Sequence, residues 1–350
     1  MFLFFIMSII QSSIAKLFNR ESLSVDEAEI TMREIMSGAA SPAQIGAFLG
    51  ALRVKGETIE EIVGSAKAMR AYALRVSVND ANAIDTCGTG GDKSGTFNIS
   101  TTASFVAAGA GAIVAKHGNR AASSQAGSAD VLGALGVNIM LKPEQVSQCV
   151  NDIGIGFAFA PNHHPAMKHA AGPRRELGAR TIFNILGPLA NPAFVKHQLL
   201  GVPDPKLIDI MATVLKELGA KHVMVVCGHG NVDELITTGV NQVCELHHGS
   251  IRHYELDPQA LGLTRHAQSE LLGGSAELNA SITRAVLDGS LSGAKLDVVL
   301  LNAGAALYVA DAVSNIGEGI AMARAAIANG AALRKLSQLA ALSTRLSAGA

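Results

Sequence analysis

The chain contains no tryptophan and only 4% aromatic residues, although 49% of its residues are hydrophobic. Its apolar mass is mostly alanine, leucine, valine and isoleucine, a composition that suits helices packed on a parallel sheet. With 350 residues the chain can bury a sizeable core, as one large domain or as two unequal ones.

An excess of charge of either sign is also missing. The sequence has 28 lysines and arginines against 29 acidic residues, so its formal net charge is −1. This balance gives no sign of a nucleic-acid or anionic-membrane partner, and we expect neither. A polyanionic ligand would have to be held by local charges and a metal ion.

Cysteine is scarce, and no two cysteines have C-x-x-C spacing. The four residues, Cys87, Cys149, Cys227 and Cys244, fit a reduced chain better than a disulfide framework or a zinc site. We therefore expect a cytoplasmic protein. Cys87 falls in a glycine-rich loop, where a small neutral filler is the simpler interpretation than a nucleophile.

The apolar start, residues 1–10, lacks the basic region and the cleavage site of a signal peptide. It is also too short to span a membrane. An amphipathic pattern begins at about Ser12. We expect translation to start at Met7, with the first six residues a start-site artefact.

Residues 1–80 have the pattern of a helical domain. Capping boxes begin at Ser24, Ser41 and Thr58, and Gly38 and Gly56 stand where helices end. From about residue 76, short apolar runs alternate with helical patterns, which predicts an α/β domain with a mostly parallel sheet. The predicted strands are residues 83–86, 112–115, 156–160, 198–202 and 222–227, followed by a hairpin of residues 243–247 and 250–254, a helix at 295–310 and one or two helices in 317–346.

A glycine-rich stretch, Asp85-Thr-Cys-Gly-Thr-Gly-Gly-Asp92, follows the first of these runs. Without Cβ atoms the glycines let the backbone approach a ligand closely, and their N–H groups can form an anion-binding concavity. Segment 96–101 then opens a helical pattern, which adds free N–H groups and the positive end of a helix dipole. The stretch fits a phosphate cradle, although taken alone an ordinary turn would be the simpler interpretation.

A second loop of the same character, residues 116–130, follows the next apolar run. Lys116 and Arg120 offer cationic donors, and its serines offer hydroxyls suited to phosphate oxygens. Two such loops at the carboxyl ends of parallel strands are stronger evidence for a polyanion site than one. Neither loop has the Walker A or the dinucleotide-binding spacing.

These motifs, with Arg174-Arg-Glu-Leu-Gly and Thr181-Ile-Phe-Asn-Ile-Leu-Gly-Pro-Leu-Ala-Asn-Pro192, resemble the anthranilate phosphoribosyltransferases of tryptophan biosynthesis over nearly the whole chain. The resemblance implies transfer of phosphoribose from phosphoribosyl diphosphate (PRPP) to the amine of anthranilate. It also implies a homodimer formed through the helical domain. We expect a helical domain of residues 1–80, joined by part of 161–190, and a PRPP-binding α/β domain of residues 81–350.

The resemblance implies two Mg²⁺ ions per subunit, held by Ser100, Asp233 and Glu234. Considered without it, Asp233-Glu234 would be a solvated acidic pair at a helix start. The PRPP site carried over from the family comprises Gly88, Gly91, Asp92, Thr96, Asn98, Ile99, Ser100, Thr101, Lys116, His117, Gly118, Asn119, Arg120, Ala121, Ala122, Ser123, Ser124 and Ser128.

Anthranilate is implied to lie against Gly88, Asn119 and Arg174. A guanidinium matches a carboxylate in geometry, and the spacing to Glu176-Leu-Gly178 selects Arg174 over Arg175. An aniline-type amine is unprotonated at pH 7, so no residue is assigned as an acid or base. His117, His163 and His164 are given positioning roles only.

Two alternatives remain at this level. A pyrimidine nucleoside phosphorylase resembles the family in fold but needs a Lys-x-Ser-Gly-Arg-Gly type of loop, where this chain has Lys-His-Gly-Asn-Arg-Ala-Ala-Ser-Ser. A non-catalytic relative that binds nucleic acid should have a basic stripe and a degraded substrate pattern.

Overall fold

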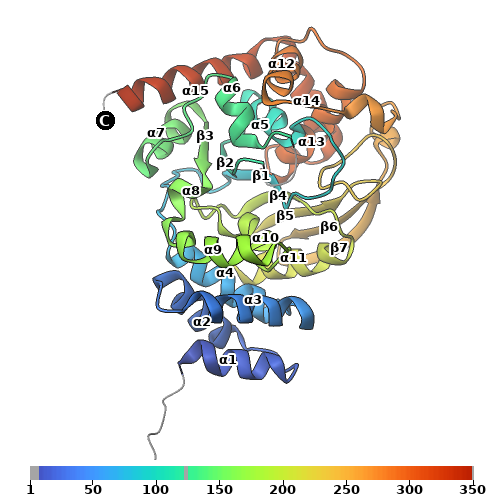
Figure 1. Ribbon diagram of the computed structural model, residues 1–350. Coiled ribbons are helices and arrows are strands. Elements are labelled where there is room, and N and C mark those ends of the chain that lie inside the picture. Colours follow the sequence, from blue (N-terminus) through green and yellow to red (C-terminus); the bar gives the residue numbers. More distant parts are fainter. Residues whose placement is uncertain (1–7, 122–124, 349–350) are drawn as a thin grey trace, which may run out of the picture. The chain divides into compact units, whose positions relative to one another are not determined.

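The computed structural model describes residues 8–121 and 125–348 (Figure 1). The start expected at Met7 lies outside the described residues. The chain divides into two compact units. The first holds the described residues up to Leu74 and the segment His164–Ala190, and the second holds Arg75–His163 and the described residues from Asn191 onward.

The first unit consists of helices. The three predicted capping boxes are confirmed, because the hydroxyls of Ser24, Ser41 and Thr58 each accept a backbone N–H three residues further on. Gly64 lies where a Cβ atom would come within 2.2 Å of the Val25 carbonyl oxygen, so it lets two helices pack closely. The elements are α1 (Ile9–Phe18), α2 (Val25–Ser37), α3 (Pro42–Lys55), α4 (Ile59–Ala71), η1 (Pro165–Met167), α9 (Lys168–Leu177), α10 (Phe183–Leu186) and η2 (Gly187–Ala190).

The second unit is built on a seven-stranded sheet in the order β3-β2-β1-β4-β5-β6-β7. The first five strands of this order are parallel, and the last two form an antiparallel hairpin. The strands are β1 (Ile84–Gly88), β2 (Val114–Gly118), β3 (Ile155–Phe159), β4 (His197–Gly201), β5 (His222–Cys227), β6 (Asn241–His247) and β7 (Ser250–Leu256).

Helices cover both faces of this sheet. In Figure 1, α5 and α13 lie on one side of the strands and α11 lies on the other. The helices of this unit are α5 (Ile99–Gly109), α6 (Ser128–Ala134), α7 (Pro143–Ile153), α8 (Ala160–His163), α11 (Lys206–Glu217), α12 (Ala276–Leu287), α13 (Ala294–Val309), α14 (Ile316–Ala328) and α15 (Ala331–Ala348), with the short turns η3 (Pro258–Leu261) and η4 (Gln268–Leu271).

The predicted fold class is confirmed: an N-terminal helical bundle precedes a mostly parallel sheet flanked by helices. The strand ends differ from the prediction, because β1 continues through Cys87 and Gly88, and β2 through Lys116, His117 and Gly118, positions that the predicted runs did not include. The apolar helix α13 is buried along nearly its whole length. Among the described residues, no helix is long and apolar enough to cross a membrane.

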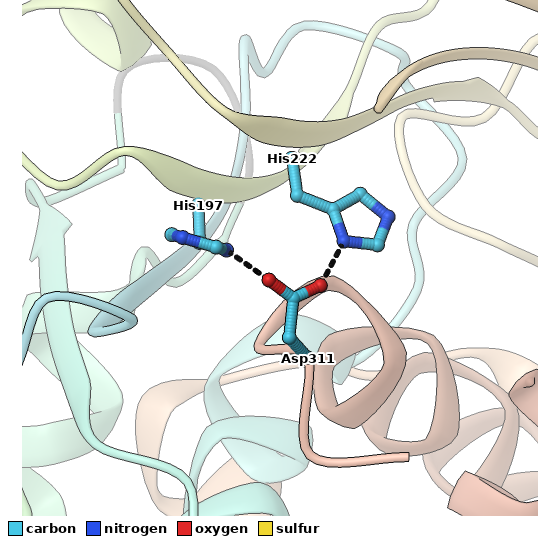
Figure 2. A group of neighbouring side chains, drawn as sticks. All are labelled: His197, His222 and Asp311. Carbon is cyan, nitrogen blue, oxygen red and sulfur yellow. Dashed lines mark hydrogen bonds and ion pairs between the residues drawn. The ribbon is translucent and has the colours of Figure 1, made fainter. Parts of the chain in front are cut away.

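A polar network lies where β4 and β5 begin. His197 and His222 are the first residues of these strands, and both face Asp311 just after α13 (Figure 2). The Nδ1 atom of His222 lies 2.6 Å from Asp311 Oδ1, and that of His197 lies 3.8 Å from Asp311 Oδ2. Asp311 has a φ of +55°, a left-handed conformation that is uncommon outside glycine.

Glu245, on β6, is the buried centre of the same network. It accepts hydrogen bonds from Tyr254 Oη at 2.7 Å and Tyr308 Oη at 2.8 Å, and Arg252 pairs with both of its oxygens. Burial raises the pKa of Glu245, but the hydrogen bonds from His222, the two tyrosines and Arg252 outweigh it and lower the pKa to about 2.

We predict that Glu245→Gln destabilises the second unit. A carboxyl with a lowered pKa in the folded state stabilises the protein above its unfolded pKa, and this stability is lost as the pH falls toward the folded pKa. The shift from 4.5 to about 2 corresponds to about 3 kcal/mol at pH 7. Urea unfolding at pH 7 and at pH 3 should show this loss at pH 7 and a much smaller one at pH 3. The exposed Glu255→Gln is the control, and equal effects of the two substitutions would contradict the assignment.

Candidate active site

Glycines mark the carboxyl ends of the strands that are expected to hold the ligand. Gly88 ends β1, Gly118 ends β2, Gly201 ends β4, and Gly228 follows β5. Parallel register places Gly88 beside Gly201. The loops that follow these strands therefore meet at one edge of the sheet, the edge where α/β folds bind ligands.

Asp233 lies directly against two of these glycines. A Cβ atom on Gly88 would come within 2.2 Å of Asp233 Oδ2, and a Cβ atom on Gly201 within 1.7 Å of the Asp233 carbonyl oxygen. The Gly90 N–H also donates to Asp233 Oδ2 at 2.6 Å. The acidic loop after β5 can approach the glycine-rich loop this closely only because no side chain separates them.

Glu234 lies at the N-terminus of α5. Its Oε1 atom accepts the Ser100 N–H at 3.0 Å, which satisfies one of the free donors of the first helical turn. Burial raises the pKa of Glu234 to about 7, although Lys116 and the Ser100 hydrogen bond act in the opposite direction. The pair Asp233-Glu234 lies in the loop between β5 and β6, so the interpretation of a solvated pair at a helix start is wrong.

A third carboxyl, that of Asp92, faces the same point. Burial, the Asp92 carboxyl and Glu234 together raise the pKa of Asp233 well above its ordinary value. Carboxylates held this close, with little water around them, repel one another unless a cation or a proton lies between them. Carboxylate and hydroxyl oxygens are ligands that Mg²⁺ accepts, so Asp92, Asp233, Glu234 and Ser100 fit a magnesium site.

Lys116 is buried, with an exposed fraction of 4%. Its ammonium group donates to the Thr86 carbonyl oxygen and lies 3.5 Å from Ser100 Oγ. Burial raises the pKa of Asp85 and of Glu234, and the nearby ammonium group of Lys116 opposes this rise in both carboxyls. Lys116 therefore supplies positive charge from beneath the glycine-rich loop.

The backbone of the glycine-rich loop adopts left-handed conformations repeatedly, at Gly90, Gly91, Lys93 and Gly95. Such a backbone turns successive N–H groups toward one side, as an anion site requires. Beyond it, Asn98 Nδ2 donates to the Ala126 carbonyl oxygen at 3.1 Å and so ties this loop to the second one. The other predicted PRPP residues here are Thr96 in the loop and Ile99 and Thr101 in the first turn of α5.

The second loop is closed by Asp130, a residue to which no role was assigned from the sequence. Its carboxylate accepts the N–H groups of Ala121 and Gly127, each at 3.0 Å, and pairs with Arg120 at 2.8 Å. Ser128 Oγ donates to the Asn119 carbonyl oxygen at 3.3 Å. The predicted residues Ala122, Ser123 and Ser124 lie outside the described residues.

The surroundings of His117, His163 and Cys87 fit structural roles for these residues. The His117 N–H donates to Asp85 Oδ1 at 3.1 Å, and His163 Nδ1 lies 3.0 Å from the Phe159 carbonyl oxygen. Burial lowers the pKa of His163 and raises that of the Cys87 thiol well above its usual range. A protonated thiol is a poor nucleophile, in agreement with the interpretation of Cys87 as a filler.

Besides Asp130, four residues that position the site were given no role from the sequence: Asp85, Asn191, Asn302 and Gly201. Asp85 is fully buried and accepts Asn191 Nδ2 at 2.8 Å, which links β1 to the segment before β4. Asn302 on α13 binds both the N–H and the carbonyl group of Leu235, beside Glu234. Asn302 and Gly201 lie in no recognised motif. Asp85 and Asn191 lie within recognised motifs, which is the only signal that could have suggested a role.

Arg174 belongs to the first unit, where it lies on α9. Its guanidinium stacks over the Phe183 ring at 5.0 Å, and burial lowers its pKa. The neighbouring Arg175 is exposed. The helix continues through Pro173 to Leu177, so the side chain is carried by a regular element.

Comparison with known proteins agrees with this architecture. Residues 11–73 match the helical bundle domain of a glycosyl transferase family, and residues 80–333 match the a/b domain of the same family. These two matches define a glycosyl transferase with a helical bundle domain and an a/b domain.

Comparison with curated proteins identifies more closely which glycosyl transferases this chain is similar to. Anthranilate phosphoribosyltransferase of Anaeromyxobacter dehalogenans strain 2CP-1 is 54% identical over 335 residues, which cover 96% of this chain and 99% of the relative. The enzyme of the same name from Chromobacterium violaceum is 53% identical over 337 residues, covering 96% and 98%.

Solved structures give the same result. Anthranilate phosphoribosyltransferase from Thermus thermophilus has a TM-score of 0.90 at 43% identity, covering 95% of this chain and 99% of that one. The Saccharomyces cerevisiae enzyme in complex with PRPP and Mg has a TM-score of 0.88 at 29% identity, covering 96% and 98%. The chain belongs to the anthranilate phosphoribosyltransferase family.

We predict that Gly201→Ala inactivates the enzyme. The new Cβ atom would meet the Asp233 backbone, which has to move by more than an ångström, and a misplacement of this size can cost about 100-fold in rate. Gly133→Ala on α6 is the matched control, since nothing lies within 4 Å of the position that its methyl group would take. The rate of PRPP-dependent anthranilate consumption should fall at least about 100-fold in the first variant and hardly at all in the second. Full activity of Gly201→Ala would show that the position of Asp233 is unimportant.

Proposed function

We propose that the edge of the sheet formed by β1, β2, β4 and β5 binds PRPP with Mg²⁺ and transfers its phosphoribose to anthranilate, as a step of tryptophan biosynthesis. The observation that carries the proposal is the half-buried group of Asp92, Asp233 and Glu234 beside the N-terminus of α5. The yeast relative, whose structure contains PRPP and Mg, supports the choice of ligand.

The chain's own residues have distinct tasks in this proposal. The N–H groups of the glycine-rich loop and of the first turn of α5 face the anionic groups of PRPP, and Lys116 adds a positive charge from below. Asp92, Asp233, Glu234 and Ser100 are the residues that would hold two Mg²⁺ ions. When bound, Mg²⁺ neutralises the charge that accumulates on the departing diphosphate.

We predict that the double substitution Asp233→Asn with Glu234→Gln lowers kcat by about 100- to 1000-fold, the typical effect of removing a group that stabilises transition-state charge. The melting temperature should stay the same or rise, because the substitutions relieve repulsion between half-buried carboxyls. Asp204→Asn, an exposed residue in the loop after β4, is the control. Near-normal kcat of the double variant at saturating Mg²⁺ would remove both residues from the mechanism.

The acceptor side of the proposal rests on Gly88, Asn119 and Arg174. Arg174 would bind the carboxylate of anthranilate, and its contact with the Phe183 ring restricts the guanidinium to few orientations. A yeast relative has been solved in complex with 4-fluoroanthranilate, an analogue of the proposed acceptor. A weakly basic amine needs no deprotonation to attack, so the proposal assigns no general base.

We predict that Arg174→Ala lowers kcat/KM for anthranilate by about 10- to 150-fold, the equivalent of one charge-assisted contact of roughly 1.5–3 kcal/mol. The KM for PRPP should change little. Arg175→Ala serves as the neighbouring control, and Lys116→Ala should affect PRPP first. Each substrate is varied at saturation of the other. A raised KM for PRPP with normal use of anthranilate would show that the acceptor site is misplaced.

We also propose that the protein is a homodimer formed through its helical unit. A groove of about 430 Å³ runs between α1 and α3, and the small residues Ala47, Gly50 and Ala51 line it. Phe18 and Val54 stand beside this groove with exposed fractions of 68% and 78%. An apolar surface of this kind is typical of an interface rather than of free surface, and a second copy of the chain is the proposed occupant.

We predict that Val54→Asp converts the dimer into a monomer, because burying an unpaired charge in an interface costs several kcal/mol. Sedimentation at micromolar concentration should show this change with an unaltered circular dichroism spectrum. Met140→Asp, at an exposed position of the second unit, should remain dimeric. A wild-type protein that sediments as a monomer would refute the proposal.

We propose that the protein is cytoplasmic, and its four free cysteines support a reducing compartment. The names of the curated relatives argue against a nucleoside phosphorylase. The presence of the carboxylates Asp92, Asp233 and Glu234 argues against a non-catalytic homologue that binds nucleic acid.

A further inference from the structure

Among the described residues, three clusters of side chains with metal-binding atoms lie outside the candidate active site. Two of them share His222: one contains His197, His222 and Asp311 (Figure 2), and one contains His222, Glu245 and His247, which belong to the network around Glu245 described above. The ring nitrogens that face Asp311 are already in use, since His197 Nδ1 lies 2.7 Å from the Val309 carbonyl oxygen and His222 Nδ1 lies 2.6 Å from Asp311. A cation there would have to break these hydrogen bonds, so this cluster is an internal polar network.

The third cluster contains Asp209 on α11, Cys244 on β6 and His253 on β7. Cys244 and His253 are directly opposite each other in the hairpin. Cys244 Sγ lies 3.9 Å from His253 Nε2, and His253 Nδ1 lies 3.2 Å from Asp209 Oδ1. One potential ligand atom from each of the three residues lies within 4.8 Å of the other two.

We propose that Asp209, Cys244 and His253 form a binding site for a thiophilic divalent cation of the Zn²⁺ class. A thiolate, an imidazole and a carboxylate are the three ligand types that Zn²⁺ takes in proteins, and a site with three protein ligands keeps a position open for water. This site is formed by other residues than the oxygen-rich site proposed for Mg²⁺. Its sulfur ligand also favours a softer metal than Mg²⁺.

The contacts within this cluster can be exchanged for bonds to a cation at small cost. A thiol is only a weak hydrogen-bond partner, so the contact between Cys244 and His253 contributes little and is lost at small cost. Ligand distances of about 2.0–2.3 Å around a tetrahedral ion place a sulfur and a nitrogen about 3.6 Å apart, close to the observed separation of 3.9 Å.

Access also suits a cation. The side chains of His253 and Asp209 are 58% and 72% exposed, so the ion can reach both from solvent, and Asp209 can turn its carboxylate from the ring to the metal. Binding displaces the proton of the Cys244 thiol to solvent as the sulfur–metal bond forms, with no change in oxidation state.

Cadmium is the probe for this site, because a cadmium–thiolate bond gives a charge-transfer band in the ultraviolet and the chain has no tryptophan to obscure it. The full-length protein is titrated with Cd²⁺ in excess Mg²⁺, and Zn²⁺ is then used to displace it. We expect one equivalent per chain, with the band absent in Cys244→Ser. His253→Ala and Asp209→Asn should weaken Cd²⁺ binding by about 10- to 100-fold.

Controls separate this site from other thiols. Cys149→Ser, a buried position on α7, and Cys87→Ser, in the glycine-rich loop, should both retain the band. His253→Ala changes an exposed side chain and tests the site even if Cys244→Ser fails to fold. The proposal is overturned if wild-type protein gives no band, if His253→Ala binds Cd²⁺ normally, or if the band disappears in Cys87→Ser instead.

Discussion

The close approach of two backbones at the end of the sheet is the constraint on which the rest of the site depends. Gly88 and Gly201 are neighbours in the parallel register, and together they leave just enough space for Asp233. Once Asp233 lies there, Glu234 reaches the N-terminus of α5 and Asp92 faces both carboxyls. A methyl group at either glycine would separate the acidic loop from the glycine-rich loop, and the carboxyls would no longer converge.

The fold could be predicted from the sequence wherever a type of residue favours one local backbone structure, such as the start of a helix. Capping boxes give the helix starts of the first unit, because a hydroxyl at the N-cap satisfies the same free N–H in each case. Short apolar runs gave the strands, and His222–Cys227 matches β5 in both bounds. The pattern failed at strand ends, where Lys116 and Gly118 continue β2 through contacts made by partner strands rather than by their own hydrophobicity.

The site was predictable only in part, for a related reason. Loop motifs identify residues where the backbone must come unusually close to another group, such as Gly88. The resemblance to a family adds Asp233 and Glu234. Gly201 and Asn302 carry no such local signal, because their importance comes from residues that lie far away in the chain, Asp233 for the glycine and Leu235 for the asparagine. A lone glycine at the end of a strand becomes meaningful only when its neighbour in space is known.

Two glutamates in the same unit show what distinguishes a binding site from a structural network. Glu245 receives donors from two tyrosines, an arginine and a histidine, and its pKa falls to about 2. Glu234 is half-buried, and the removal of its carboxyl from water outweighs the help of Lys116 and the Ser100 N–H, so its pKa rises to about 7. The donors around Glu245 stabilise its charged form, whereas Glu234 lacks enough positive charge nearby. In the function proposed here, a bound Mg²⁺ ion would supply that charge, and a carboxyl with a perturbed pKa of this kind is typical of a functional site.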